Sequence, residues 1–228
     1  MIIGNGLVAS ALKKYCDRHD VVIFASGVSN SLEQDSDSFL REERLLRESL
    51  GKYRKQTFVY FSTVSVYDMS AKFSAYVQHK LEMEKIVSDT ATAYLIFRLP
   101  QVVGQSDNGS TLTNFLYAHI KNGLSFDIWG GAVRYLVDID DVAKFVSFVI
   151  DDAQRSNIVV NMSTVACKVL DIVTCLEKIT GKKAVFKIIN RGSEYSPPPM
   201  DPLLTASSAG ITIDESYTER VLLKYYKT

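Results

Sequence analysis

The sequence predicts an α/β fold in which helices cover both faces of a parallel sheet. Its first half alternates short, apolar, β-branched segments with longer segments of helical periodicity, the pattern of parallel strands joined by crossover helices. A glycine turn, Gly4-Asn5-Gly6, separates the first apolar segment from the first helical one. With 228 residues, of which 46% are hydrophobic, the chain can bury a core and form one domain, or one domain with a small lobe.

The elements of the first half are defined by short apolar runs and by apolar residues spaced three and four apart. Asp20–Ala25 (DVVIFA), for example, has the length and β-branched content of a buried strand. In Asp37–Leu50 the apolar residues share one face, and we expect the acid-rich remainder to form a solvated face. In chain order we expect a strand at Met1–Ile3, a helix at Leu7–Tyr15, a strand at Asp20–Ala25, a loop at Ser26–Ser36, a helix at Asp37–Leu50, a strand at Thr57–Phe61, a helix at Ser74–Ser88 and a strand at Tyr94–Arg98.

The second half is more mixed, although the same two patterns identify most of its elements. Arg191–Leu204 holds four of the five prolines and should be irregular. The other expected elements are a helix at Leu112–Asn122, a mixed region with Ile128–Gly131 and Tyr135–Val137, a helix at Asp141–Asp151, a strand at Ile158–Met162, a helix at Val169–Thr180, a strand at Ala184–Ile189 and a helix at Thr218–Tyr226.

Composition excludes several classes of function. The 26 Lys and Arg residues balance the 26 Asp and Glu residues, so the chain has no broad basic field for nucleic acid. Three cysteines without paired spacing indicate a reduced, cytosolic setting, and the three histidines lack the spacing of metal ligands. The apolar runs are far shorter than a membrane span, and no signal peptide is visible. We therefore expect a cytoplasmic protein that binds no metal, nucleic acid or membrane.

The turn at Gly4–Ala9 has the pattern G-x-G-x-x-A between a strand and a helix, which is the setting of a dinucleotide-binding turn. Gly4 permits the tight turn, Gly6 lets a pyrophosphate approach the backbone, and Ala9 keeps the helix close to the sheet. The alternative is a glycine turn that holds no ligand. An acidic residue that would bind the ribose is missing from the window Phe24–Asn30.

Tyr76 and Lys80 form a Y-x-x-x-K pattern on a predicted helix, where residues four apart share one face. The ammonium of Lys80 should lower the pKa of the Tyr76 phenol, which could then pass a proton to or from a sugar oxygen. Thr63 closes a buried strand and would offer a hydroxyl to the same oxygen. The alternative is an ordinary Tyr–Lys pair on a surface helix. His79 should lie at the surface, on the side of the helix away from Lys80.

Taken together, these segments resemble the extended short-chain dehydrogenase/reductase family of nucleotide-sugar epimerases, dehydratases and reductases. Gly4–Ala9 resembles the family's glycine turn, and Asp20–Ala25 resembles its fourth strand rather than its second. Val59–Tyr67 resembles the fifth strand with its S-S-x-x-V-Y ending, which gives Thr63 the place of the catalytic Ser or Thr. Later stretches that match family patterns are Phe97–Gly104 (FRLPQVVG), Trp129–Ala143 (WGGAVRYLVDIDDVA) and Val160–Ser163 (VNMS).

The resemblance implies a catalytic set of Thr63, Tyr76 and Lys80 and a nicotinamide cofactor, either NAD or NADP. In the family, the lysine of this set orients the ribose of the cofactor. The pyrophosphate should lie at the glycine turn and the nicotinamide near Ser26 and Pro100. The cofactor-binding residues implied in this way are Gly4, Gly6, Leu7, Val8, Ser26, Tyr76, Lys80 and Pro100.

The resemblance also implies a nucleotide-sugar substrate. Arg134 falls where the family places an arginine that contacts the substrate diphosphate, and Arg191 falls where a second one is common. A guanidinium suits a diphosphate because it offers planar, bidentate donors. For Arg134 the alternative is a structural ion pair with one of the nearby acids Asp138, Asp140 and Asp141.

The sequence departs from the family pattern in three places. The glycine turn is one residue tighter than usual, and the stretch between Thr63 and Tyr76 is shorter. The pattern also passes from the first helix directly to the family's fourth strand, so the second and third strands, which form the adenosine side of the cofactor site, are deleted. The fold should therefore be a truncated Rossmann-like parallel sheet with its first strand at or near an edge.

We expect two parts in this fold. Residues 1–106, joined by residues 136–163, should form the dinucleotide-binding core, and residues 107–135 and 164–228 should form a small substrate-binding lobe. The family's usual dimer predicts a homodimer, in which the apolar face of the Asp37–Ser49 helix packs against the Ser74–Ser88 helix of a twin subunit.

Three hypotheses for function follow. The first is an enzyme that acts on a sugar hydroxyl or carbonyl through Thr63, Tyr76 and Lys80 with a nicotinamide, in surface polysaccharide or deoxysugar synthesis. The alternative is a non-redox nucleotide-sugar-binding protein or partner subunit that has lost NAD(P) binding, which the deleted adenosine half favours. An NAD(P)-sensing regulator ranks last, because it would need neither Arg134 nor Arg191.

Overall fold

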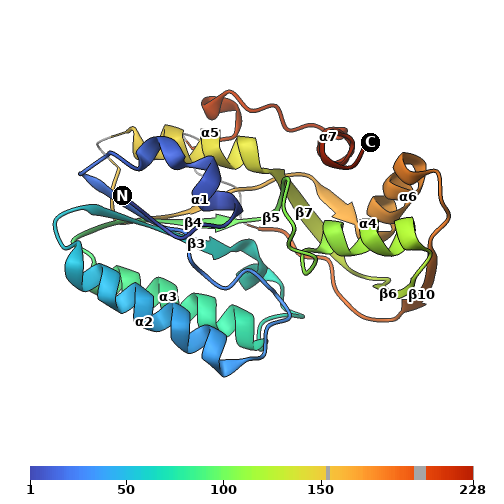
Figure 1. Cartoon of the computed structure of the whole chain (residues 1–228), viewed down its shortest axis with the longest axis horizontal. Helices are drawn as coiled ribbons and strands as arrows, with labels where there is room; N and C mark the ends of the chain where they lie inside the picture. The colour runs from blue at the N-terminus through green and yellow to red at the C-terminus, as the bar shows by residue number, and fades with distance from the viewer. Residues whose placement is uncertain (153–154, 198–203, 228) are drawn as a thin grey trace.

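The computed structural model describes residues 1–152, 155–197 and 204–227, so part of the expected irregular stretch, residues 198–203, lies outside the described residues. Its centre is a five-stranded parallel sheet in the order β1-β2-β3-β4-β8 (Figure 1). β1 lies at an edge, as the deletion of two strands predicts, and the truncated Rossmann-like sheet is confirmed. The strands are β1 (Ile2–Ile3), β2 (Val21–Phe24), β3 (Thr57–Thr63), β4 (Ala93–Leu99) and β8 (Ile158–Asn161).

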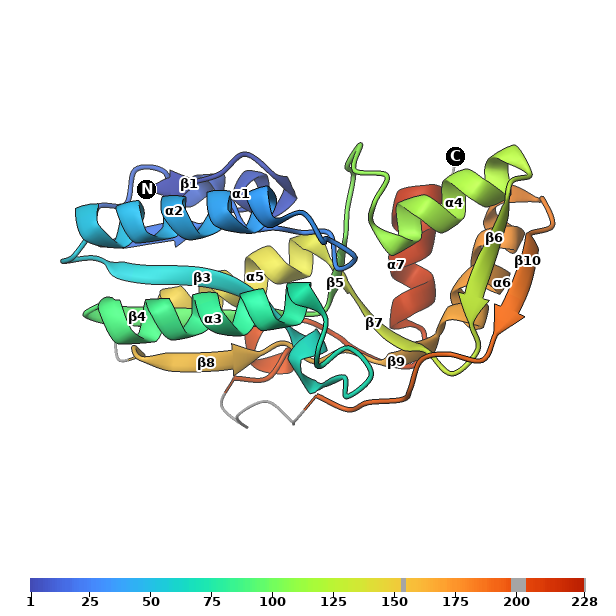
Figure 2. The same ribbon diagram turned by 90° about the horizontal axis from the view of Figure 1, so that it is seen from below.

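Helices cover both faces of this sheet. α2 (Ser36–Lys52) and α3 (Ala75–Thr90) pack side by side on one face, and α1 (Leu7–Ala11) and α5 (Ile139–Ile150) lie on the other (Figures 1 and 2). The first helix is shorter than predicted, because the chain tightens after five residues into the 3-10 helix η1 (Lys13–Tyr15). Within the described residues, no helix combines the length and the apolar character needed to cross a membrane.

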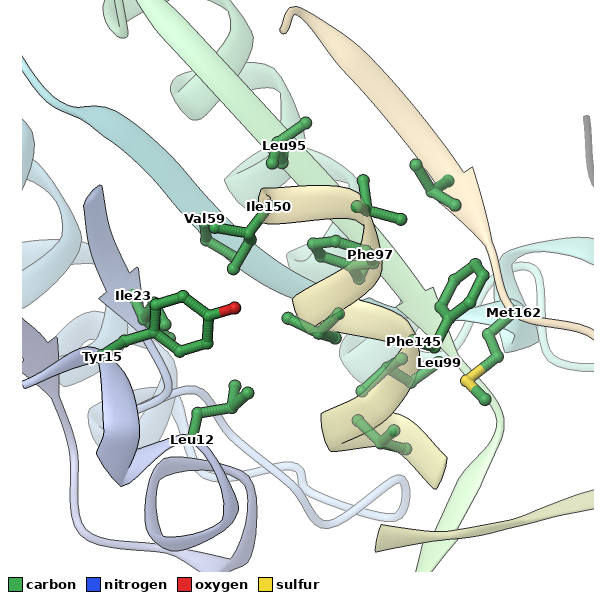
Figure 3. Close-up of a cluster of buried hydrophobic side chains, with 14 of the residues drawn as sticks. Leu12, Tyr15, Ile23, Val59, Leu95, Phe97, Leu99, Phe145, Ile150 and Met162 are labelled. Carbon is green, nitrogen blue, oxygen red and sulfur yellow. The ribbon is translucent and has the colours of Figure 1, made fainter. Parts of the chain in front are cut away.

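The two faces of the sheet carry separate apolar cores, as expected for strands that are buried on both sides. Along β3, Val59 joins the core under α1 and α5, whereas Phe58 and Tyr60 join the core under α2 and α3. Figure 3 shows the first of these cores, in which Phe97 of β4 meets Phe145 of α5 edge to face, with ring centroids 6.2 Å apart.

A third apolar cluster lies outside the main sheet. Figure 2 shows most of its elements, among them α4, α6, α7, β6 and β10, at the end of the molecule away from the main sheet. The sequence predicted a mixed region with Ile128–Gly131 and Tyr135–Val137, and a strand at Ala184–Ile189. The structure forms two small sheets there, β6 with β10, and β5, β7 and β9 together. The division into core and lobe remains a prediction. The elements of the third cluster are β5 (Gln101–Val103), α4 (Leu112–Asn122), β6 (Ser125–Trp129), β7 (Val133–Asp138), β9 (Ala166–Lys168), α6 (Val169–Thr180), β10 (Val185–Ile189) and α7 (Tyr217–Tyr226). The 3-10 helix η3 (Ser207–Ala209) packs against α5 and the first core instead.

Candidate functional site

The carboxyl ends of β3, β4 and β8 meet at one edge of the sheet, where parallel α/β sheets bind their ligands. Thr63 is the last residue of β3, and its hydroxyl accepts a hydrogen bond from the backbone N–H of Ser65, 3.1 Å away, which starts the 3-10 helix η2 (Val64–Tyr67). Tyr76 lies in the first turn of α3, which Ser74 caps through the N–H of Val77. The hydroxyl of Thr63 lies close enough to the phenol of Tyr76 to oppose the rise in its pKa, so the structure brings these two predicted residues together.

Lys80 follows Tyr76 by one turn of α3, and its Nζ lies 5.9 Å from the centre of the Tyr76 ring. The lysine is nevertheless buried, with 3% of its surface exposed. Its ammonium donates to Glu42 Oε1 at 3.0 Å, to Glu42 Oε2 at 3.4 Å and to the hydroxyl of Tyr60 at 3.2 Å. Lys80 is thus paired with a carboxylate that the sequence analysis did not single out.

Glu42 comes from α2 and is fully buried, with an exposed fraction of 0%. Besides Lys80, its oxygens contact the Tyr60 hydroxyl at 2.7 Å, the backbone N–H of Val28 at 2.6 Å and His79 Nε2 at 3.1 Å. Four different groups therefore surround one carboxylate, which has about four lone-pair sites to offer. We call these five residues, Val28, Glu42, Tyr60, His79 and Lys80, the Glu42 cluster.

The Glu42 cluster changes the electrostatics expected for Tyr76. Burial opposes ionisation of Glu42, but Lys80 and the hydrogen bonds prevail and lower the pKa of Glu42 to about 2. The pKa of Lys80 is lowered, mainly by burial, against the pull of Glu42. Burial, with Glu42 second, raises the pKa of Tyr76 well above its usual value. The expectation that Lys80 lowers the pKa of Tyr76 is therefore wrong, because burial disfavours the phenolate and the negative charge of Glu42 adds to that effect.

The burial of His79 and Glu42 differs from what the sequence predicted. His79 is 7% exposed and contacts Glu42, so its predicted surface position is wrong. The charges of α2 do not all face solvent, since Glu42 points inward. A signal for this was present in the sequence: Glu42 precedes the inward-facing Leu46 and Leu50 by four and eight residues and so shares their helix face.

The glycine turn is fixed by contacts within the protein. Gly4 has a φ of +123°, and a Cβ at this position would lie 2.3 Å from the carbonyl oxygen of Ala25 and 3.0 Å from the backbone nitrogen of Ser26. The turn thus lies directly against the loop after β2, with Gly4 next to Ala25 and Ser26. A Cβ at Gly6 would meet nothing within 4 Å, so the turn is open on that side. Leu7 and Val8 are half-buried at the start of α1, and Pro100 is buried between β4 and β5.

A nicotinamide dinucleotide, the cofactor that the resemblance implies, would need several parts of this site at once. The open side of the turn at Gly6 leaves room for a pyrophosphate. In the described sheet no strand lies beyond β1, where the adenosine half of the cofactor would be held. The ammonium of Lys80, which would bind the ribose, instead donates its hydrogen bonds to Glu42 and Tyr60. The residues present therefore do not fit a dinucleotide held in the manner of the family.

The two predicted substrate arginines lie apart from this cluster. Arg134, on β7, is half-buried and donates to the backbone carbonyl of Val133 at 2.8 Å. Asp138 and Asp140, two of the acids considered as its ion-pair partners, instead bind Lys224. Arg191 is exposed, and its carbonyl accepts the N–H of Gly131 at 3.1 Å. The side chain of Arg191 forms no hydrogen bond or ion pair with the described residues.

Tyr195 links Arg134 to the turn that follows Thr63. Burial raises the pKa of Tyr195 to about 12, and the nearby charge of Arg134 and the hydroxyl of Ser65 both oppose that rise. The backbone carbonyl of Tyr195 accepts a hydrogen bond from the hydroxyl of Tyr135. A concavity of about 480 Å³ opens beside these residues, over β7, β9 and residues 194–196. In the described part of the chain, no three His, Cys, Asp or Glu residues are grouped so that they could hold a metal ion.

Comparisons with known proteins agree with this architecture. The sequence profile of the NAD dependent epimerase/dehydratase family matches residues 1–163. A comparison with curated proteins finds no match. The structure is similar to the UDP-glucose 4-epimerase of Thermus thermophilus in complex with NAD, with 15% identity and a TM-score of 0.69 over 96% of this chain and 81% of that one.

Two further solved structures have the same fold. One is the UDP-glucuronic acid 4-epimerase of Bacillus cereus in complex with NAD, with 20% identity and a TM-score of 0.71 over 98% of this chain and 76% of that one. The other is MoeE5 in complex with UDP-glucuronic acid and NAD, with 18% identity and a TM-score of 0.72 over 96% of this chain and 82% of that one. At such identities the similarity establishes a shared fold.

Proposed function

Since this chain belongs to the NAD dependent epimerase/dehydratase family, we propose that it binds a nucleotide-linked sugar at the carboxyl edge of its sheet. The observation that carries the proposal is the proximity of Thr63 and Tyr76, two hydroxyl-bearing residues brought together by the end of β3 and the first turn of α3. Hydroxyl groups so placed can donate to and accept from the hydroxyls of a sugar. MoeE5, one of the similar structures, holds UDP-glucuronic acid and NAD.

Buried polar atoms near this edge support a polar ligand. Among the described residues, four side-chain oxygens at or just beyond the carboxyl ends of β3, β4 and β8 are buried without a hydrogen-bond partner. Such groups are costly unless something satisfies them. A sugar hydroxyl would do so where a small movement of the covering side chains exposed one of these oxygens. The four are the side-chain oxygens of Ser62, Gln101, Ser163 and Thr164.

We assign the diphosphate of this ligand to Arg134 on β7. Tyr195 supports this assignment, because it is near both Arg134 and Ser65, and Ser65 lies in the turn that follows Thr63. A diphosphate bound by Arg134 would leave the attached sugar pointing toward Thr63 and Tyr76. Arg191 stays a second, more peripheral candidate for the same diphosphate.

Two forms of this function differ in the role of a cofactor. The geometry favours the non-redox form, in which the protein binds a nucleotide sugar or serves as a partner subunit, because Lys80 is held by Glu42. The second candidate is an NAD(P)-dependent enzyme acting on a sugar hydroxyl or carbonyl. The Thr63–Tyr76 pair and the open side of the turn at Gly6 support that candidate.

Calorimetric titration separates the two forms. The protein is titrated with NAD, NADH, NADP and NADPH, each alone and together with UDP-, GDP-, CDP- and dTDP-sugars. Binding of a sugar nucleotide without binding of any dinucleotide supports the non-redox form. Micromolar binding of one dinucleotide, followed by turnover, supports the enzyme. No binding of any sugar nucleotide contradicts the proposal in both forms.

Tyr76→Phe tests the contact with the sugar. Loss of one hydroxyl that hydrogen-bonds the ligand should weaken sugar-nucleotide binding by about 0.5–1.5 kcal/mol, roughly two- to tenfold in Kd. The matched control is Tyr94→Phe, which should leave the Kd unchanged. Tyr94 lies near the start of β4, at the opposite end of the strands from the proposed site. Equal affinities of the wild type and Tyr76→Phe would remove Tyr76 from the binding site.

The setting of this function is also proposed here. We place it in the cytoplasm, in the synthesis of surface polysaccharides or deoxysugars, with the protein acting as a homodimer. The free thiols of Cys16, Cys167 and Cys175 agree with a reducing compartment. On α2, Leu40 is 60% exposed and would be covered in a dimer. Analytical ultracentrifugation tests the dimer, and a monomer at micromolar concentration would contradict it.

A further inference from the structure

The ammonium of Lys80 has no hydrogen-bonding capacity left for a ligand. An ammonium has three N–H donors. Here they face the two oxygens of Glu42, at 3.0 and 3.4 Å, and the hydroxyl of Tyr60 at 3.2 Å. The ring of Tyr60 also lies under the ammonium, with its centroid 5.2 Å away. All of these partners belong to the protein itself.

The loop after β2 closes over the same ammonium. A Cβ at Gly27 would lie 2.6 Å from Lys80 Nζ and 2.9 Å from Glu42 Oε1, so only a glycine lets the backbone approach this closely. The next residue, Val28, donates its N–H to Glu42 Oε2 at 2.6 Å. The side chain of Lys80 is consequently 3% exposed, and a ribose could reach Nζ only if this loop moved away.

Glu42 also cannot easily give way to a ligand. If a ribose hydroxyl replaced it as the partner of Lys80, three other donors would lose their acceptor, namely the N–H of Val28, the hydroxyl of Tyr60 and Nε2 of His79. Buried donors without an acceptor are strongly unfavourable. A neutral ribose diol would also leave the charge of Lys80 without a counter-charge in a buried place.

From these contacts we propose that Lys80 is a structural cation, and that the carboxylate of Glu42 permanently occupies the place where a dinucleotide ribose would otherwise meet it. Lys80 then neither binds a nicotinamide cofactor nor activates Tyr76. This inference adds a structural reason to the non-redox form of the proposed function. It rests on that proposed function only for the identity of the sugar ligand. Thr63 and Tyr76 remain as neutral hydroxyls that contact the ligand without exchanging protons with it.

A double-mutant cycle tests the pairing itself. Glu42→Gln and Lys80→Met each remove one charge, and the double variant removes both while keeping similar volumes. Each single variant should melt at a lower Tm than the wild type, and the double variant should lose less than the sum of the two losses, because neither charge is left alone. Additive losses would overturn the proposal, since they would mean that the two charges do not depend on each other.

Titration with NADH tests the consequence for the cofactor. Under the non-redox form, neither the wild type nor the double variant should bind NADH measurably. If the wild type does bind NADH, the double variant should bind it with a Kd within twofold, because Lys80 makes no contact with the dinucleotide. A Kd at least tenfold weaker in the double variant would overturn the proposal. If the double variant fails to fold, Tyr60→Phe takes its place, because it withdraws one protein partner from Lys80. Under the proposal it also leaves the NADH affinity unchanged within twofold, and a tenfold or larger change overturns it.

Failure of the proposed function would look different. It would appear as a lack of binding of every sugar nucleotide by the wild type. That result would not change the expected outcome of the double-mutant cycle or of the NADH titration. The two conclusions can therefore fail separately.

Discussion

Replacement of Glu42 by glutamine should lower the free energy of unfolding by about 3–5 kcal/mol at neutral pH. The substitution keeps the size and shape of the side chain, so the loss reports the charge rather than the packing. It leaves the ammonium of Lys80 buried without a counter-charge, and removing one partner of a buried pair costs about this much. Chemical denaturation of the two proteins measures the difference.

The matched control for this substitution is the neighbouring residue on the same helix. Glu43 forms an ion pair with Arg47 one turn later, at 2.7 Å, and their side chains are 29% and 56% exposed. Glu43→Gln should change the free energy of unfolding by no more than about 0.5 kcal/mol, because exposed pairs contribute little. A cost for Glu42→Gln as small as that of Glu43→Gln would mean that α2 is rotated differently and does not bury Glu42.

The same carboxylate should give the protein an acid-sensitive stability. Burial raises the pKa of Glu42, but Lys80 and the hydrogen bonds outweigh it and lower the pKa from 4.5 to about 2. A carboxylate whose pKa is depressed in the folded state stabilises the fold above the unfolded pKa, and this stabilisation is lost as the pH falls from about 4.5 to about 2. The difference in free energy of unfolding between the wild type and Glu42→Gln should therefore become smaller as the pH falls over that interval.

Denaturation curves at several pH values between 7 and 2 measure this effect. Asp20, whose pKa is lowered to about 2 mainly by a hydrogen bond from Arg18, titrates in the same interval. It is present in both proteins, so its contribution cancels in the difference. A difference that stays constant from pH 7 to pH 2 would contradict the assignment of a depressed pKa to Glu42.

The main sheet was predictable because its signals are local. β2 and β3 are short β-branched runs that are buried on both faces, and α2 and α3 have regular apolar spacing. The edge position of β1 followed from the missing pair of strands. The small sheets were not predictable in the same way. β5 and β9 have three residues each, and such short strands are defined by pairing with β7 rather than by their own pattern.

The Glu42 cluster shows why the candidate site was only half predictable. The spacing of Tyr76 and Lys80 placed them correctly on one helix, and the end of β3 placed Thr63 beside them. The sequence could not show which charge would face Lys80, because that depends on how α2 packs against α3. The partner comes from a residue 38 positions away, on another helix. The spacing of Tyr76 and Lys80 therefore identified these residues, whereas the packing of α2 against α3 determines their pKa values and their exposure to solvent.

Gly4→Ala should destabilise the protein by about 2–6 kcal/mol, of which a positive φ accounts for about 1–3 and a forced close contact for about 1–3. Gly4 has a φ of +123°, and an added Cβ would lie 2.3 Å from the backbone oxygen of Ala25, which cannot rotate away as a side chain could. Gly6→Ala is the control, because its Cβ would meet nothing within 4 Å, and it should cost no more than about 1 kcal/mol.

This pair of variants also separates the two meanings of the glycine turn. Thermal unfolding reports the structural role, and titration with sugar nucleotides and dinucleotides reports a role in binding. We expect Gly4→Ala to unfold at a lower temperature because it displaces the loop after β2, which carries Gly27 and Val28 over the Glu42 cluster. A well-folded Gly6→Ala variant that lost binding of a ligand would show that the open side of the turn holds its phosphate. Equal stabilities of the two variants would contradict the close contact between Gly4 and Ala25 on which the structural role depends.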